Sequence, residues 1–120
     1  MQKVKGIGGV FFRALDPQAL AAWYRDNLGV DPVPTSYEEQ PWRQEAGPTV
    51  FAPFEQETDY FGARENQFMV NFRVDDLEAM IAQLEAAGIK VRRWPDPMPN
   101  GTFAHLNDPE GNQIELWQPA

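Results

Sequence analysis

Gly9–Trp23, GVFFRALDPQALAAW, is followed 60 residues later (72 − 12, from Phe12 to Phe72) by the similar stretch Met69–Gln83, MVNFRVDDLEAMIAQ. The identical pairs include Phe12 and Phe72, Arg13 and Arg73, Asp16 and Asp76, Ala19 and Ala79, and Ala22 and Ala82. Matches at one fixed offset indicate two copies of one supersecondary unit. Because each unit is too small to bury its own hydrophobic face, we expect both copies to share one core.

The composition is ordinary for a soluble globular domain. Of the 120 residues, 42% are hydrophobic and 23% are charged. No run approaches the roughly 18 apolar residues of a membrane span, and Met1–Lys5 lacks the apolar region of a signal peptide. Cysteine is absent, which excludes disulfides and thiolate metal sites. These features predict a cytoplasmic location.

The formal charge of −8 at pH 7 disfavours nucleic acid and anionic membranes as partners. Both are bound through a cationic surface, which this chain has little means to build. The acidic balance is compatible with a cationic ligand and, more simply, with solubility alone.

The first half is predicted to hold a strand over residues 7–14 and a short strand over residues 49–54. Between them, Asp16 caps a helix that has Pro17 at its first position and ends at Gly29. The segment from 31 to 48 is predicted as strand interrupted by loop, because it contains Pro32, Pro34, Pro41 and Pro48.

The second half repeats the order. A strand is predicted over residues 68–74, followed by a helix that Asp75 or Asp76 caps and Gly88 ends. This helix buries a stripe formed by Leu77, Met80, Ile81 and Leu84. Further strands are predicted over residues 89–94, 102–107 and 112–117, with a tight turn at Asp108–Gly111.

Alternation along the strands sorts side chains between the helix face and a concave face. The residues expected under the helices are Val10, Phe12, Ala14, Val70, Phe72, Val74, Ile114 and Leu116. Those expected to face the concavity are Gly9, Phe11, Arg13, Met69, Asn71, Arg73, Gln113, Glu115 and Trp117.

Asp108–Leu116, DPEGNQIEL, and the helix end Trp23–Gly29, WYRDNLG, resemble the vicinal oxygen chelate superfamily of glyoxalases, bleomycin-resistance proteins and extradiol dioxygenases. The resemblance covers essentially the whole chain. It implies an α+β fold in which two βαβββ modules form a cupped, half-open barrel, commonly as a homodimer. We expect a single domain, residues 1–120, with module 1 at about 4–54, a connector at 55–67 and module 2 at about 68–118.

The resemblance also implies where metal-dependent members carry their four ligands. The first-strand positions are Gly9 and Met69, the last-strand position of module 2 is Glu115, and its counterpart in module 1 falls near Phe51. Only Glu115 is a suitable ligand for Zn, Mg or Fe(II). We therefore predict no metal of the usual kind and no cofactor. A rearranged site using Glu115, His105 and Asn71 remains open.

Eight concave-face residues are the candidate ligand-binding residues: Phe11, Arg13, Phe51, Met69, Asn71, Arg73, Glu115 and Trp117. Glu115 can be a structural carboxylate paired with Arg13 or Arg73, or the three charges can bind a polar group of a ligand. The apolar members can fill a closed barrel or line a pocket. Trp94 and Met98, with Tyr37 and Trp42, lie on Pro-rich loops that could cover its mouth.

His105 is the only histidine and the best general-base candidate, although a lone strand histidine is more often a packed residue.

The sequence leaves three hypotheses about the function open. The leading hypothesis is a metal-free protein that binds a small organic molecule, similar in kind to bleomycin-resistance proteins. The second is a metal-dependent lyase or dioxygenase of the glyoxalase type with a rearranged site. The third is an interaction domain whose cup is filled by its own side chains. The sequence does not decide whether the chain is an enzyme.

Overall fold

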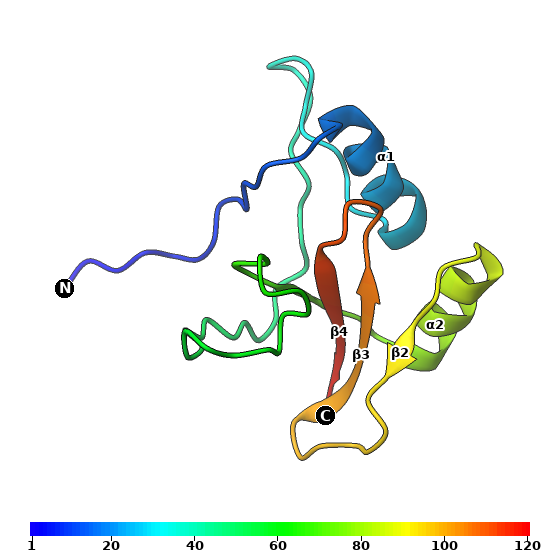
Figure 1. Cartoon of the computed structure of the whole chain (residues 1–120). Coiled ribbons are helices and arrows are strands. Elements are labelled where there is room, and N and C mark those ends of the chain that lie inside the picture. The colour runs from blue at the N-terminus through cyan, green and yellow to red at the C-terminus, as the bar shows by residue number, and fades with distance from the viewer.

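The computed structural model describes residues 1–120 as a mixed α+β fold with two helices and an open four-stranded sheet (Figure 1). The elements are α1 (Pro17–Leu28), β1 (Val70–Arg73), α2 (Leu77–Ala86), β2 (Arg92–Arg93), β3 (Gly101–Asn107) and β4 (Gln113–Pro119). Neither helix has the length and apolar character that a membrane span requires.

Both helices begin at the predicted caps. The Asp16 carboxylate accepts a hydrogen bond from the Ala19 amide at 3.1 Å, and Asp76 accepts one from Ala79 at 3.0 Å. Such bonds satisfy amides that have no partner within the helix. Helix α1 ends where Gly29 adopts φ 71°, the left-handed conformation that glycine tolerates best.

The sheet has the strand order β1-β4-β3-β2. Strand β1 is parallel to β4, with Val70 opposite Ile114, while the other two pairings are antiparallel. The second copy of the repeat therefore forms the predicted strand and helix. The strand predicted over residues 89–94 is shorter than expected and comprises only Arg92–Arg93.

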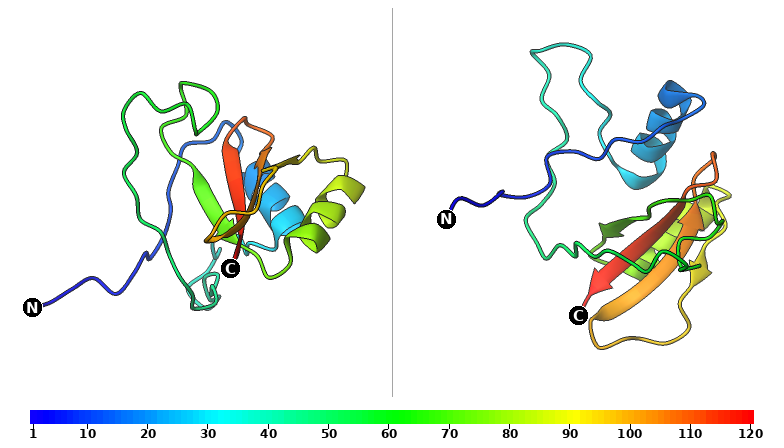
Figure 2. Two further views of the ribbon diagram at one scale, coloured as in Figure 1. Left: turned by 90° about the horizontal axis from the view of Figure 1, so that it is seen from below. Right: turned by 60° about the vertical axis from the view of Figure 1, so that its left-hand side comes forward.

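The core lies between α2 and the sheet. Its fully buried members are Leu77, Ile81, Leu84, Ala104, Leu106, Ile114 and Leu116. The helix stripe and the inward parity of β4 are thus as predicted. Helix α1 packs Trp23, Tyr24 and Leu28 against the same cluster. Both helices lie on one side of the sheet, and the segment preceding β1 lies on the other (Figure 2).

The first copy of the repeat differs from the prediction. Residues 7–14 and 49–54 form no strand, and Phe11 and Phe51 are 94% and 85% exposed. A strand persists only where its backbone groups find a partner. Strand β1 has β4 beside it, whereas residues 7–14 have no strand beside them, because residues 49–54, the counterpart of β4 in the first copy, are not part of the sheet.

The β3–β4 turn fixes helix α1 to the sheet. The buried Asp108 carboxylate accepts bonds from the amides of Glu110 and Asn112 and, at 2.7 Å, from the Tyr24 hydroxyl. The Glu110 carboxylate accepts bonds from the amides of Leu15 and Asp16, just before α1. The turn with the sequence DPEGN therefore links the two halves of the chain through hydrogen bonds.

We expect Tyr24→Phe to lower the free energy of unfolding by about 1–2 kcal/mol, because it removes a hydrogen bond to a buried carboxylate. Tyr37→Phe is the matched control, since the Tyr37 side chain is fully exposed, and its effect should stay within about 0.5 kcal/mol. Urea unfolding followed by circular dichroism measures both. Equal effects of the two substitutions would show that the Tyr24–Asp108 bond does not hold α1.

Candidate functional site

The sheet face opposite α2 carries a buried carboxylate, Glu115, which is only 7% exposed. Glu115 sits in β4 between Ile114 and Leu116, which point into the core, so alternation directs its side chain to the other face. In the register of the sheet, Asn71 of β1 and His105 of β3 flank Glu115 on its two sides. Pairing therefore brings these three side chains together.

Three donors converge on the Glu115 carboxylate. Asn71 Nδ2 donates to Oε1 at 2.7 Å. Oε2 accepts the Tyr60 hydroxyl at 2.6 Å and lies 2.8 Å from His105 Nε2. No buried side-chain nitrogen or oxygen in the structure lacks a hydrogen-bond partner. The carboxylate is thus buried at little cost, because its lost hydration is replaced.

These contacts shift two pKa values. Burial alone would raise the pKa of Glu115, but the hydrogen bonds from His105, Tyr60 and Asn71 outweigh it and hold that pKa below its usual value. Burial and the neighbouring carboxylate raise the pKa of Tyr60. Glu115 is consequently an ionised acceptor, so His105 donates to it through Nε2–H.

Aromatic rings surround the carboxylate. The Tyr60 ring stacks on Phe54 with centroids 5.7 Å apart and planes inclined by 21°. It meets Trp94 at 6.0 Å and the His105 ring at 5.2 Å. Trp94 is 44% exposed and Asn71 is also exposed, so solvent reaches the cluster from two sides. We call Glu115, His105, Asn71, Tyr60 and Trp94 the sheet-face site.

The structure brings some predicted site residues together and not others. Asn71 and His105 contact Glu115 directly. Met69 and Trp117 lie farther along the same face, where Met69 Sδ is 3.3 Å from Gln113 Nε2 and Trp117 Nε1 donates to the Asn100 carbonyl at 2.8 Å.

Phe11, Arg13 and Phe51 are exposed, on segments outside the sheet, and do not join this cluster. Arg73 donates to the Glu45 carbonyl at 2.9 Å. Neither Arg13 nor Arg73 pairs with Glu115, so the structure forms neither the ion pair nor the three-charge cluster that were the two alternatives for this carboxylate. The physical reason is that neutral donors and His105 already satisfy the carboxylate.

Sequence reasoning did not identify Tyr60, which lies in the segment treated only as a connector. The available signal was an aromatic pair, Tyr60-Phe61, within an otherwise polar and acidic stretch. Trp94 was expected only as cover for the concavity. Tyr37, expected with it, is fully exposed and covers nothing.

The side chains present do not fit the four-ligand metal site of metal-dependent superfamily members. The structure contains no group of three or more His, Cys, Asp or Glu side chains placed to hold a metal ion. Gly9 offers no donor, and both Glu115 oxygens already accept hydrogen bonds. Glu115, His105 and Asn71 do meet, and they are the three residues considered for a rearranged site.

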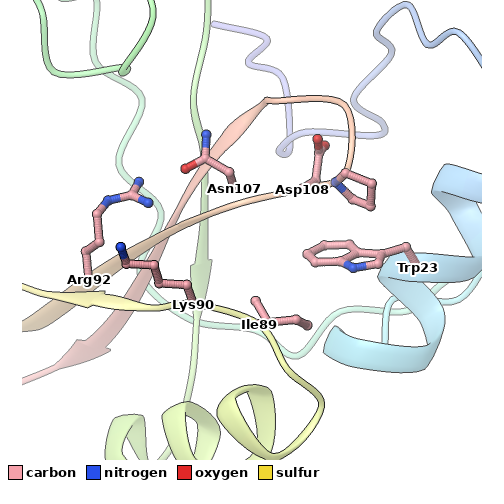
Figure 3. Close-up of a pocket in the computed structure, with 7 residues that line it drawn as sticks. Trp23, Ile89, Lys90, Arg92, Asn107 and Asp108 are labelled. Carbon is pink, nitrogen blue, oxygen red and sulfur yellow. The ribbon is translucent and has the colours of Figure 1, made fainter.

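A depression of about 360 Å³ lies between α1, the segment that leads into β2 and the β3–β4 turn, away from the sheet-face site (Figure 3). Its lining residues are Trp23, Ile89, Lys90, Arg92, Asn107, Asp108 and Pro109. None of them is a predicted site residue. Asp108 is engaged in the turn and with Tyr24, and Arg92 Nη2 donates to Gln113 Oε1 at 3.1 Å, so the exposed lining of this depression is mostly apolar.

The chain is similar to glyoxalase-like proteins in sequence and in fold. The glyoxalase-like domain family matches residues 9–117 of the chain. An antibiotic-binding protein, TnmS3, from Streptomyces sp. CB03234 is 26% identical, with 88% of each chain covered and a TM-score of 0.52. A lactoylglutathione lyase from Agrobacterium tumefaciens is 23% identical, with 98% of this chain and 96% of that chain covered and a TM-score of 0.63.

A glyoxalase/bleomycin resistance protein from Streptomyces sp. CB03234 is 35% identical. That match covers only 44% of this chain and 46% of the other, with a TM-score of 0.39. No curated protein matches the chain.

The lowered pKa of Glu115 predicts acid-sensitive stability. A carboxyl group with a depressed folded-state pKa contributes stability that is present above its unfolded value, near 4.3, and is lost as the pH falls below it. In Glu115→Gln, we therefore expect the melting temperature to fall less steeply with acidification below about pH 4.5. Glu38→Gln, which alters an exposed carboxylate, should keep the profile of the unmodified protein. Parallel profiles in all three proteins would contradict the role of Glu115.

Proposed function

We propose that this chain, which belongs to the glyoxalase-like domain family of the vicinal oxygen chelate superfamily, binds a small organic molecule at the sheet-face site. We further propose that it does so without the metal ion of its metal-dependent relatives. One observation carries the proposal. The buried Glu115 carboxylate accepts the Tyr60 hydroxyl, and the Tyr60 ring contacts Trp94, which is 44% exposed.

A site of this composition favours planar guests that carry a hydrogen-bond donor. Aromatic side chains such as Trp94 provide flat apolar surface for a ring, and Glu115 accepts from a hydroxyl or ammonium group. A few convergent polar groups within an apolar wall are typical of small-molecule sites. The net charge of −8 also favours neutral or cationic guests over anionic ones.

The similarity to an antibiotic-binding protein supports a binding role. That protein is named for binding rather than for a reaction, and it matches most of this chain. Sequestration of a ligand requires apolar surface and a few polar contacts rather than a set of metal ligands, and the aromatic rings and the carboxylate of the sheet-face site support such a role.

A metal-dependent lyase or dioxygenase is the second candidate. It is favoured by the meeting of Glu115, His105 and Asn71 in one cluster. A carboxylate that orients an imidazole through Nε2 is also an arrangement used for general-base catalysis, with Nδ1 as the proton acceptor.

We expect planar aromatic compounds that carry a hydroxyl or ammonium group to raise the melting temperature of protein that contains no stoichiometric metal. Trp94→Ala should weaken calorimetric binding by about 3- to 10-fold, because an aromatic contact is lost. Trp42→Ala removes a similarly exposed indole outside the site and should have no effect. Binding that is equal in both variants would contradict the assignment. Stoichiometric Zn, Ni, Mn or Fe that is lost on Glu115→Ala would favour the second candidate.

We also propose that the protein is a homodimer. The segments at residues 7–14 and 49–54 are rich in apolar side chains, as buried strands are. Nevertheless, Phe11, Val50 and Phe51 in these segments are exposed. Strand β1 is the edge of the sheet, so its free side has unpaired backbone groups. A second copy of the chain would cover both features, because exposed apolar surface and an open edge favour association.

Light scattering should therefore give twice the mass of the chain. The double variant Phe11→Glu, Phe51→Glu should shift the protein toward the monomer, since it places charge in the proposed contact. Tyr37→Glu is the control, because Tyr37 is equally exposed but lies outside these segments. A monomeric unmodified protein would contradict the proposal.

A further inference from the structure

Tyr60 enters the sheet-face site from a segment that has no helix or strand. Its hydroxyl makes the shortest of the three contacts to Glu115, 2.6 Å against 2.7 Å from Asn71 and 2.8 Å from His105. Two of these three side chains belong to strands of the sheet, and Tyr60 alone belongs to the connector. The third donor to the carboxylate is therefore the one that the sheet does not fix.

The Tyr60 ring is held on several sides. Phe54 stacks on it, while Trp94 and His105 present their rings at steep angles of 60° and 82°. Together with the acceptor Glu115, these rings make the contacts that a phenol requires: apolar contacts around the ring and one acceptor for its hydroxyl. The surroundings of Tyr60 thus form a slot for a phenol, and the chain fills that slot itself.

Few bonds keep Tyr60 in the slot. Apart from its hydroxyl, its carbonyl accepts a bond from Gln113 Nε2 at 2.7 Å, and its amide donates to Thr58 Oγ1 at 3.2 Å. The residue is only half-buried, and neighbouring Trp94 and Asn71 are exposed. Displacing Tyr60 would consequently leave the core between α2 and the sheet unchanged, because no core residue belongs to the connector.

We propose that Tyr60 is an internal ligand, and that the slot it fills is the recognition site for a phenol-type ring of an incoming molecule, which displaces Tyr60 and donates its hydroxyl to Glu115. This inference rests on the proposed binding function and narrows its ligand class from planar aromatic donors to neutral, hydroxyl-bearing rings.

The charge balance of the site favours a neutral donor. Glu115 Oε2 already faces His105, and Oε1 faces the Asn71 amide, so a hydroxyl replaces Tyr60 without adding charge. Burial and the adjacent carboxylate raise the pKa of the Tyr60 hydroxyl, which keeps it protonated as a donor near neutral pH. The hydroxyl of an incoming phenol would lie beside the same carboxylate, so it would also stay protonated and act as a donor.

The test uses p-cresol, which is the small-molecule analogue of the tyrosine side chain, and toluene, which lacks the hydroxyl. In Tyr60→Ala, p-cresol should bind roughly 10- to 100-fold more tightly than toluene, the range expected for a hydrogen bond to a charged acceptor. Binding of p-cresol should strengthen in the order unmodified protein, Tyr60→Phe, Tyr60→Ala, because the internal competitor is progressively removed. His105 is the only histidine, so its ring signals in NMR report binding beside Glu115.

Tyr37→Ala is the control and should bind p-cresol as the unmodified protein does. Should Tyr60→Ala not fold, the comparison of Tyr60→Phe with the unmodified protein decides, and equal affinities would overturn the inference. Equal affinities for p-cresol and toluene, or tighter binding of 4-methylbenzylamine than of p-cresol, would also overturn it.

If compounds bind the unmodified protein but Tyr60 substitutions change nothing, the internal ligand is refuted while the proposed function stands. If p-cresol binds only Tyr60→Ala and nothing binds the unmodified protein, Tyr60 is not displaced, and both the internal ligand and the proposed function are refuted.

Discussion

A carboxylate buried on a sheet must be given donors, and the arrangement around Glu115 follows from that requirement. Leaving the ionised group unpaired would cost several kcal/mol, whereas three hydrogen bonds replace the water that it loses. The donors come from β1, from β3 and from the connector, so one side chain links segments far apart in the sequence. The parallel pairing of β1 with β4 is what places Asn71 beside Glu115.

The second half of the chain was predictable because its local and long-range signals agree. Asp76 marks the start of α2, Gly88 follows its end, and alternation in Gln113–Trp117 assigns Glu115 to the face opposite the core. Alternation is a geometric property of any paired strand, so it holds wherever a partner strand exists. Alternation alone places Asn71 and Glu115 on the same face of the sheet.

In the first half of the chain, the local pattern alone did not predict the structure correctly. Its strand-like segment at 7–14 shares Phe12 and Arg13 with the second copy, but sequence similarity does not supply a neighbouring strand. Pairing is a long-range event that no local pattern encodes. The same limit applies to Arg73, which was expected at Glu115 and instead reaches a backbone carbonyl, and to Tyr60, whose position depends on the path of an irregular segment.

The surroundings of Glu115 determine which partners its carboxylate can take. A cation neutralises a carboxylate by charge, whereas Asn71 and Tyr60 neutralise nothing and only donate hydrogen bonds. The negative charge therefore persists in the site and remains available to any molecule that brings a donor of its own. Among the three donors, His105 is fixed by its strand and Asn71 by its pairing, so exchange can occur most easily at the connector. A carboxylate held by a replaceable hydroxyl donor is suited to recognising hydroxyl-bearing rings, because each arriving hydroxyl restores the bond that the departing one breaks.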